Sequence, residues 1–417
     1  MSPTEAGGPL SVAVVGVASL LPGSQDVRGF WRDVVTGRDL LDEVPPSHWL
    51  ISDYHDPDPT AADRTYARRG AFLDPFRYDP IRYGTSPAVL SATDTAQLLA
   101  LPVAERALTD AVGGDPERLA GLDRERAGVI VGTGALELLL QMACRMQRPV
   151  WLNALRGSGV AEPLARQICD RIAGHYVPWQ EATFPGLLAN VVAGRIANRL
   201  DLHGTNCAVD AACASSLAAL SHAVAELELG RADLMLVGGV DTFNDITMFT
   251  CFSKTPALSP TGDCRPFSDR ADGTMLGEGL VFFALKRLAD AERDGDQVYA
   301  VLRGLGSSSD GAGNAIYAPA PQGQARALRR AYDQAGYAPR TVELVEGHGT
   351  GTPAGDAAEV AALTEVFGRA ERPWCALGSA KSQFGHTKSA AGAVGLLKTV
   401  LALHHKVLPP TIKVTRP

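Results

Sequence analysis

Four short, uninterrupted runs of apolar residues constrain the fold of this chain more than any other feature. They cover residues 12–17, 127–132, 234–240 and 279–285. A run of this length without polar alternation predicts a strand that is covered on both faces. Segments with helical character separate the runs, such as the helix expected from an Asp94 cap to Val112. We therefore expect an α/β protein built on a central parallel sheet.

The second half of the chain repeats this alternation, and no low-complexity linker precedes it. Strands are expected at residues 300–305, 341–345 and 376–379, and helices at residues 323–335, 356–367 and 389–404. Two halves of similar pattern predict a duplicated layer architecture. A polar, proline-rich insertion at about residues 49–90 interrupts the first half. It either covers another part of the protein or is a surface elaboration without a chemical role.

Composition and charge narrow the functional classes. The 417 residues, 46% hydrophobic and 20% charged, are typical of a globular protein with two or three domain-sized units. A net charge of −7 without a basic stripe argues against nucleic acid as a partner. No apolar stretch approaches the roughly 20 residues that span a bilayer. The first residues, with Glu5 and Gly7, lack the cationic segment of a signal peptide. Seven cysteines without zinc-like spacing indicate a reducing compartment, so we expect a cytoplasmic protein.

Cys213 stands where a strand-like run gives way to a helix. Its neighbours Ala212 and Ala214 are small, and apolar residues follow at helical spacing as far as Gly230. A thiol at a helix N-terminus lies near unpaired N–H groups and the positive end of the helix dipole, which favour the nucleophilic thiolate. Free cysteine is also a common small packing residue. From this stretch alone, Cys213 is either a nucleophile or part of a buried turn.

Two histidines and a lysine lie in later loops rich in small residues. His348 is part of Gly-His-Gly-Thr-Gly-Thr, and Lys381 precedes His386, which follows Gly385. A cysteine that forms a thioester needs an imidazole within reach, and carbon–carbon bond formation needs donors that stabilise an enolate. Either histidine alone could be structural. Together with Cys213, the two would meet both needs.

Other motif interpretations fail on spacing. Gly349, Gly351 and Gly355 are spaced two and four residues apart, which does not match the dinucleotide fingerprint G-x-G-x-x-G. Ala380 stands before Lys381 where a Walker A loop has glycine. No pair of histidines or cysteines offers the spacing of a metal cage, so we expect no metal.

Three motifs are similar to those of beta-ketoacyl synthases of the thiolase-like superfamily, and they occur in the order found in that family. They are VDAACASSL at 209–217, EGHGTGTPAGDAAE at 346–359 and KSQFGHTKSAAG at 381–392. The resemblance runs from Val12 to the end of the chain. It implies a five-layered α/β/α/β/α fold of two similar halves, which we place at residues 1–285 and 286–417. It also implies a homodimer without a metal or nucleotide cofactor.

Further stretches point to one branch of the family. GTMLGEG, IYAPAPQGQARALRRAY and ALHHKVLPPTI, among others, resemble ketosynthase domains of polyunsaturated-fatty-acid-synthase-like and related iterative polyketide megasynthases. The resemblance implies that Cys213 accepts an acyl chain from an acyl carrier protein. A malonyl unit on a carrier protein then loses CO2 and attacks that thioester. His348 and His386 would hold the malonyl carbonyl and stabilise the enolate.

The resemblance also assigns supporting residues. Lys381 and Glu359 match a charged pair that orders the histidines, and Thr350 and Thr352 match residues that contact the pantetheine arm of the carrier. After the segment at residues 408–412, the family continues into a final strand pair with a glycine-rich loop, which supplies a second oxyanion N–H. That loop does not occur in these 417 residues. We therefore expect the C-terminal end of the family domain to be missing and its second half to be truncated.

Two other functions remain open at this point. A non-condensing or inactive partner subunit would share the fold, although relatives of that kind typically replace the nucleophile, and Cys213 is present. A cysteine hydrolase could use Cys213 and His348 and would release a free acid. A purely structural module would leave the three polar segments without a role.

Overall fold

The computed structural model describes residues 10–312 and 318–417. Glu5 and Gly7, which bear on the signal peptide, lie outside the described residues, as do the first two residues of the IYAPAPQ stretch. Within the described part of the chain, no helix is both long enough and apolar enough to cross a membrane.

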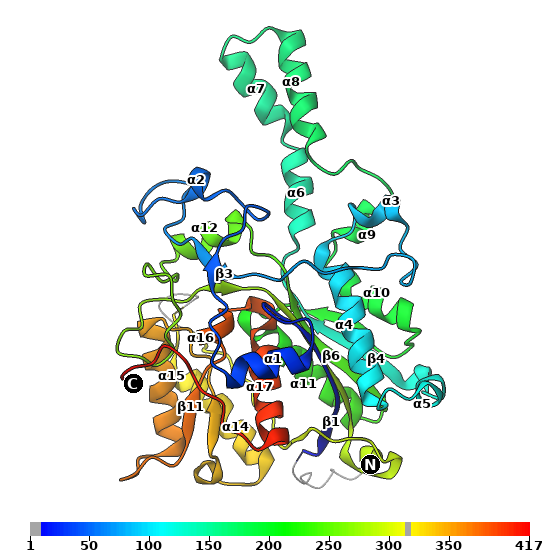
Figure 1. Ribbon diagram of the computed structural model, residues 1–417, viewed down its shortest axis with the longest axis vertical. Helices are drawn as coiled ribbons and strands as arrows, with labels where there is room; N and C mark the ends of the chain where they lie inside the picture. Colours follow the sequence, from blue (N-terminus) through cyan, green and yellow to red (C-terminus); the bar gives the residue numbers. More distant parts are fainter. Residues whose placement is uncertain (1–9, 313–317) are drawn as a thin grey trace.

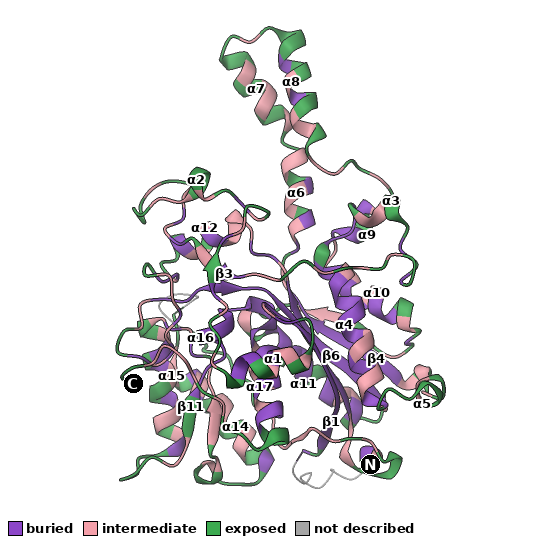
Figure 2. Cartoon of the chain, viewed as in Figure 1, coloured by how far each residue is buried: buried purple, intermediate pink, exposed green. Residues whose placement is uncertain are grey.

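A six-stranded sheet forms the centre of the protein, in the order β5-β4-β6-β8-β1-β9. Its strands are β1 (Val12–Leu20), β4 (Ala127–Gly132), β5 (Asn206–Val209), β6 (Leu234–Asp241), β8 (Gly279–Arg287) and β9 (Ala300–Leu302). All four predicted apolar runs are strands of this sheet, and nearly all of their residues are buried (Figure 2).

The expectation of a parallel sheet is wrong for three of the five strand pairings. β4 pairs in parallel with β5 and β6. β8 runs antiparallel to both β6 and β1, and β9 runs antiparallel to β1. Helices cover both faces of the sheet, so every central strand is apolar whatever its direction. The apolar pattern reports burial and carries no information on strand direction.

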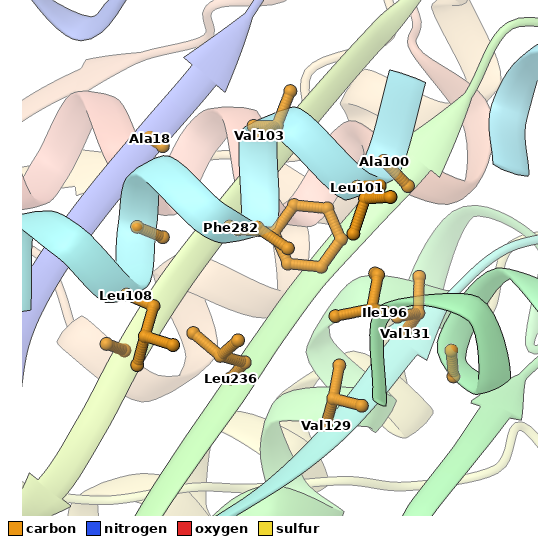
Figure 3. Close-up of a cluster of buried hydrophobic side chains, with 14 of the residues drawn as sticks. Ala18, Ala100, Leu101, Val103, Leu108, Val129, Val131, Ile196, Leu236 and Phe282 are labelled. Atoms are coloured by element: carbon orange, nitrogen blue, oxygen red, sulfur yellow. The ribbon is translucent and has the colours of Figure 1, made fainter. Parts of the chain in front are cut away.

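One face of the central sheet packs against α4 (Thr95–Ala111) and α10 (Asn190–Leu200). Figure 3 shows side chains of both helices, among them Leu101 and Ile196, meeting Val129, Leu236 and Phe282 from the strands. Asp94 caps α4 as expected, because its carboxylate accepts a hydrogen bond from the N–H of Ala96 at 2.8 Å.

The opposite face packs against α11 (Ser215–Glu228) and α17 (Ala391–His405), which also contact each other. Beyond them lies a second sheet, in which β10 (Leu344–Glu346) and β11 (Ala376–Gly378) pair in parallel. The helices α14 (Pro321–Ala335) and α15 (Pro353–Phe367) form the outermost layer (Figure 1). The result is the expected order of layers, helix, sheet, helix, sheet, helix.

Two features extend from the layers. The insertion contains α2 (Ile51–Tyr54), β3 (Arg69–Ala71) and α3 (Pro87–Leu90) and packs on the segment around α12 (Ile246–Lys254). For example, the Thr65 hydroxyl lies 2.7 Å from that of Ser253. The helices α6 (Glu137–Arg145), α7 (Arg148–Gly157) and α8 (Glu162–Gly174) form an arm that projects from the body (Figure 1). We did not anticipate this arm from the sequence.

Candidate active site

Cys213 lies in a tight turn between β5 and α11. The turn is the 3-10 segment η2 (Ala212–Ala214), so the cysteine precedes the α-helix by two residues. Ala212 adopts a positive φ of 50°, which is strained for a residue with a side chain. Asp210 and Ser215 stabilise this turn, because the N–H of Ala212 donates to the Asp210 carboxylate and the Ser215 hydroxyl donates to the carbonyl of Ala212.

Two glycines let the nucleophile turn approach the strands beneath it. A Cβ at Gly132 of β4 would lie 2.4 Å from the backbone nitrogen of Ser216. A Cβ at Gly239 of β6 would lie 2.7 Å from Cα of Ala390 and 2.8 Å from Cβ of Ser216. Gly239 is therefore the point where the segments after Cys213 and after His386 converge on the sheet.

His348 belongs to a loop that follows β10. The carboxylate of Glu359, on α15, accepts hydrogen bonds from the N–H groups of His348 and Gly349 at 2.6 and 2.8 Å. Lys381 Nζ donates to the carbonyl of His348 at 2.6 Å. The two charged residues thus bind opposite sides of the same short stretch of backbone.

His386 lies between α16 (Lys381–Phe384) and α17. Its N–H donates to the carbonyl of Met275 at 2.6 Å, and its carbonyl accepts from the N–H of Gly277. The N–H of Lys388 donates to Nδ1 of His386 at 3.0 Å. Because Nδ1 is an acceptor here, the neutral ring carries its proton on Nε2.

The structure brings the three predicted catalytic side chains together. One side-chain ligand atom from each of Cys213, His348 and His386 lies within 4.8 Å of the other two. The two imidazole rings are 5.2 Å apart between centroids and meet at 85°. Cys213 is half-buried, His348 is exposed and His386 is buried.

Charge and burial set the protonation states of the group. The positive charge of Lys381, followed by desolvation, lowers the pKa of His348. Burial, followed by Lys381, lowers the pKa of His386 well below its ordinary value. Both rings are therefore neutral at pH 7. Burial raises the pKa of the Cys213 thiol even though Lys381 opposes it, so the expected preference for thiolate is not met.

A thiol and two imidazoles at this spacing are also donors that zinc uses. The surrounding charges disfavour a cation, because the amino groups of Lys381 and Lys388 both act on this site. Nδ1 of His386 accepts from a backbone N–H, so Nε2 carries the proton of the neutral ring and offers no lone pair to a metal ion. The residues fit an acyl thioester better than a metal ion.

The other predicted residues lie around the same loop. Lys381 is buried, and burial lowers its pKa while nearby carboxylates raise it, Glu346 first. Thr350 and Thr352 bind each other through their hydroxyl groups at 2.8 Å. Sequence reasoning missed Asp356, which is 6% exposed and accepts from the N–H groups of Phe267 and Gly351 at 2.7 and 3.1 Å. The quoted motif contains Asp356, so its position beside the glycine loop was the available signal.

The fold and the site define a thiolase-like condensing architecture, in which one cysteine and two histidines from the two halves converge. Comparison with known proteins identifies the family. The model of the beta-ketoacyl synthase N-terminal domain matches residues 10–291, and that of the C-terminal domain matches residues 299–415. This chain belongs to the beta-ketoacyl synthase family. The C-terminal domain is present, so the expectation that its end is missing from the chain is corrected.

The relatives are large synthases. The chain is 39% identical to a polyunsaturated fatty acid synthase polypeptide of Thraustochytrium over 416 residues, covering 97% of this chain and 14% of the relative. It is 38% identical to a mycocerosic acid synthase-like polyketide synthase of Mycolicibacterium smegmatis over 407 residues, covering 97% and 18%. The chain therefore spans less than a fifth of these relatives.

Solved ketosynthase domains share the fold. An oxazolomycin ketosynthase domain of Streptomyces albus superposes with a TM-score of 0.84 at 31% identity, over 97% of this chain and 64% of that one. The ketosynthase from module 6 of the bacillaene synthase of Bacillus subtilis gives 0.79 at 30% identity, over 98% and 63%. This similarity confirms the predicted fold class.

Proposed function

We propose that this protein catalyses a decarboxylative Claisen condensation between an acyl group on Cys213 and a malonyl thioester on a carrier protein. The observation that carries this proposal is the convergence of one thiol and two neutral imidazoles within 4.8 Å. Acyl transfer needs the thiol, and enolate formation needs hydrogen-bond donors rather than a strong base.

In the first half-reaction, the sulfur of Cys213 attacks the thioester carbonyl of the acyl carrier. The new S–C bond replaces the bond to the pantetheine sulfur, and the thiol proton leaves with the carrier thiol. Because burial raises the pKa of Cys213, the proton must be transferred during the attack. His348, which is neutral and exposed, is placed to accept it and pass it on.

In the second half-reaction, a malonyl thioester replaces the departed carrier. Loss of CO2 leaves the electron pair on the adjacent carbon as an enolate, whose oxygen accepts hydrogen bonds from the two imidazoles. Nε2–H of His386 is the donor that the structure supports best, because Nδ1 already accepts from the N–H of Lys388. The enolate carbon then attacks the Cys213 thioester, and the sulfur leaves to give a beta-ketoacyl product.

The remaining residues support these steps in our proposal. Lys381 and Glu359 keep the backbone of His348 fixed, since one binds its carbonyl and the other its N–H. Thr350 and Thr352 contact the pantetheine arm. No metal or nucleotide takes part, and the substrates arrive on phosphopantetheine.

We further propose that the protein acts as a homodimer within a larger cytoplasmic synthase of polyketide or fatty acid chains. The lengths of the relatives support the larger assembly. The seven cysteines, all of them free and all in described segments, support a reducing compartment. We divide the chain into halves at residues 1–285 and 286–417, close to the end of β8.

Intact-protein mass spectrometry after incubation with a series of acyl carrier thioesters tests the proposal, together with CO2 release from a malonyl carrier. We expect one acyl group per chain, which is lost in Cys213→Ala. A silent partner subunit, the alternative that the intact Cys213 disfavours, would take up no acyl group. A cysteine hydrolase would release free acid and no ketoacyl product.

A further inference from the structure

A second buried charge pair lies behind the candidate site. Lys398, on α17, donates to the carboxylate of Glu346, on β10, at 2.7 Å. Only 1% of the Lys398 side chain and 8% of the Glu346 side chain are exposed. Such a pair contributes little to stability by itself, because desolvation offsets most of the attraction. Its location therefore calls for another explanation.

The Glu346 carboxylate joins three segments that carry the candidate site. Glu346 ends β10, two residues before His348. One of its oxygens accepts from the N–H of Ala380, the residue before Lys381, and the other accepts from Lys398. Lys398 belongs to the helix that begins after His386. One carboxylate thus connects the strand before His348, the residue before Lys381 and the helix that follows His386.

Glu346 also faces the charge of Lys381. Among the carboxylates that raise the pKa of Lys381 against burial, Glu346 has the largest effect and Glu359 follows. Both carboxylates have their oxygens bound to other groups, Glu359 to the backbone of His348 and Gly349 and Glu346 to Ala380 and Lys398, so each acts on Lys381 through its charge, and the charge of Glu346 has the larger effect. The titratable groups around Lys381 are Glu346, Glu359, Asp356, Cys264, Cys213, His348 and His386.

We propose that Glu346 and Lys398 form a buried positioning pair, which holds the segments of both histidines in register and maintains the charge of Lys381. The effect of the pair on catalysis rests on the proposed function. The effect of the pair on the charge of Lys381 is independent of that function. Neither Glu346 nor Lys398 touches the reacting atoms in this proposal. They act through the residues that do.

Two single substitutions test the pair with opposite expected signs. Glu346→Gln removes the main counter-charge, so Lys381 loses its proton at a lower pH. Lys398→Met removes the cation that competes for Glu346, so Lys381 retains its proton to a higher pH. The loss of the Lys381 proton is followed as a pH-dependent change in the ring signals of His348, in protein labelled with 13C-histidine. A His348→Asn variant assigns these signals. If the pair served stability alone, the pH at which Lys381 loses its proton would stay unchanged in both variants, or would move in the same direction in both.

The same variants are tested for decarboxylation of a malonyl carrier as a function of pH. We expect the alkaline limb of the pH–rate profile for decarboxylation to move to lower pH in Glu346→Gln and to higher pH in Lys398→Met. The rate of acyl loading on Cys213 should stay within threefold of wild type, which corresponds to about 0.6 kcal/mol in activation free energy. The matched control is Lys286→Met. Lys286 lies near the C-terminal end of β8, and the substitution breaks its ion pair with Asp296. It should lower the melting temperature and leave both pH profiles unchanged.

The outcomes separate the two proposals. If the wild type loads no acyl group or releases no CO2, the proposed function fails, while the His348 signals still test the pair. If both single variants leave the Lys381 step in place, or move it in one direction, the positioning pair is refuted. If a single variant does not fold, the charge-balanced double variant Glu346→Gln/Lys398→Met replaces it. We expect it to load acyl groups and lose about 10- to 100-fold in decarboxylation. Wild-type decarboxylation in the double variant would overturn the inference.

Discussion

Replacing Gly239 by alanine tests whether activity depends on the close approach of two segments, the one after Cys213 and the one after His386, to strand β6. The added Cβ would lie 2.7 Å from Cα of Ala390 and 2.8 Å from Cβ of Ser216, where carbon atoms prefer about 3.5–4.0 Å. The two segments must therefore separate by about 1 Å. Overpacking of this kind costs about 1–3 kcal/mol of unfolding free energy. A displacement of about 1 Å at reacting groups costs about 100-fold in rate.

The assay for Gly239→Ala combines a melting curve with acyl loading and condensation rates. Loading depends mainly on Cys213, and condensation also needs His386, so we expect condensation to fall about 100-fold and loading to fall less. Gly174→Ala is the matched control, because a Cβ there meets nothing within 4 Å. A Gly239→Ala protein that melts earlier but condenses within threefold of wild type would refute the link between this contact and the site.

Three further expectations follow from named contacts. The alkylation rate of Cys213 by iodoacetamide should rise with pH toward a midpoint above that of an ordinary cysteine, because burial raises the pKa of this thiol, and Lys381→Met should raise the midpoint further, since the lysine charge favours the thiolate. Peptide mass spectrometry against time measures both rates. Asp94→Ala should cost about 1–2 kcal/mol and expose the arm to limited proteolysis, because this carboxylate caps α4 and also accepts from the N–H of Leu138 in α6. Asp356→Ala should slow condensation more than acyl loading in the two rate assays, since two backbone N–H groups beside the His348 loop lose their acceptor.

The sequence predicted the strands of the central sheet better than their arrangement. β6 and β8 were both expected as buried strands, and both are buried along nearly their whole length. Their antiparallel pairing could not be predicted, because residues covered by helices on both faces are apolar in either direction. The arm from α6 to α8 was missed for a different reason. Its helices have partly exposed faces, and α7 packs on α8, so they resemble ordinary surface helices.

The candidate site was predictable as a set of residues but not in its electrostatics. The motifs supplied Cys213, His348, His386 and Lys381, and the structure places all four together. The expected thiolate at Cys213 was wrong, because a helix terminus can be read from sequence but the burial of a sulfur cannot. Burial depends on segments more than a hundred residues away.

The same long-range burial explains why the site relies on neutral groups. The charge of Lys381 lowers the pKa of His348, and burial followed by Lys381 lowers the pKa of His386, so neither ring becomes a cation at pH 7. A neutral imidazole can still donate from one nitrogen, and for His386 the backbone has already fixed which one. Stabilising an enolate needs donors that stay in place and keep their protons, which is what a neutral ring with one occupied nitrogen provides. In the reaction that we propose, the lysine therefore acts by keeping His348 neutral and by adding to the effect of burial at His386, and the carboxylates around it act by maintaining its charge.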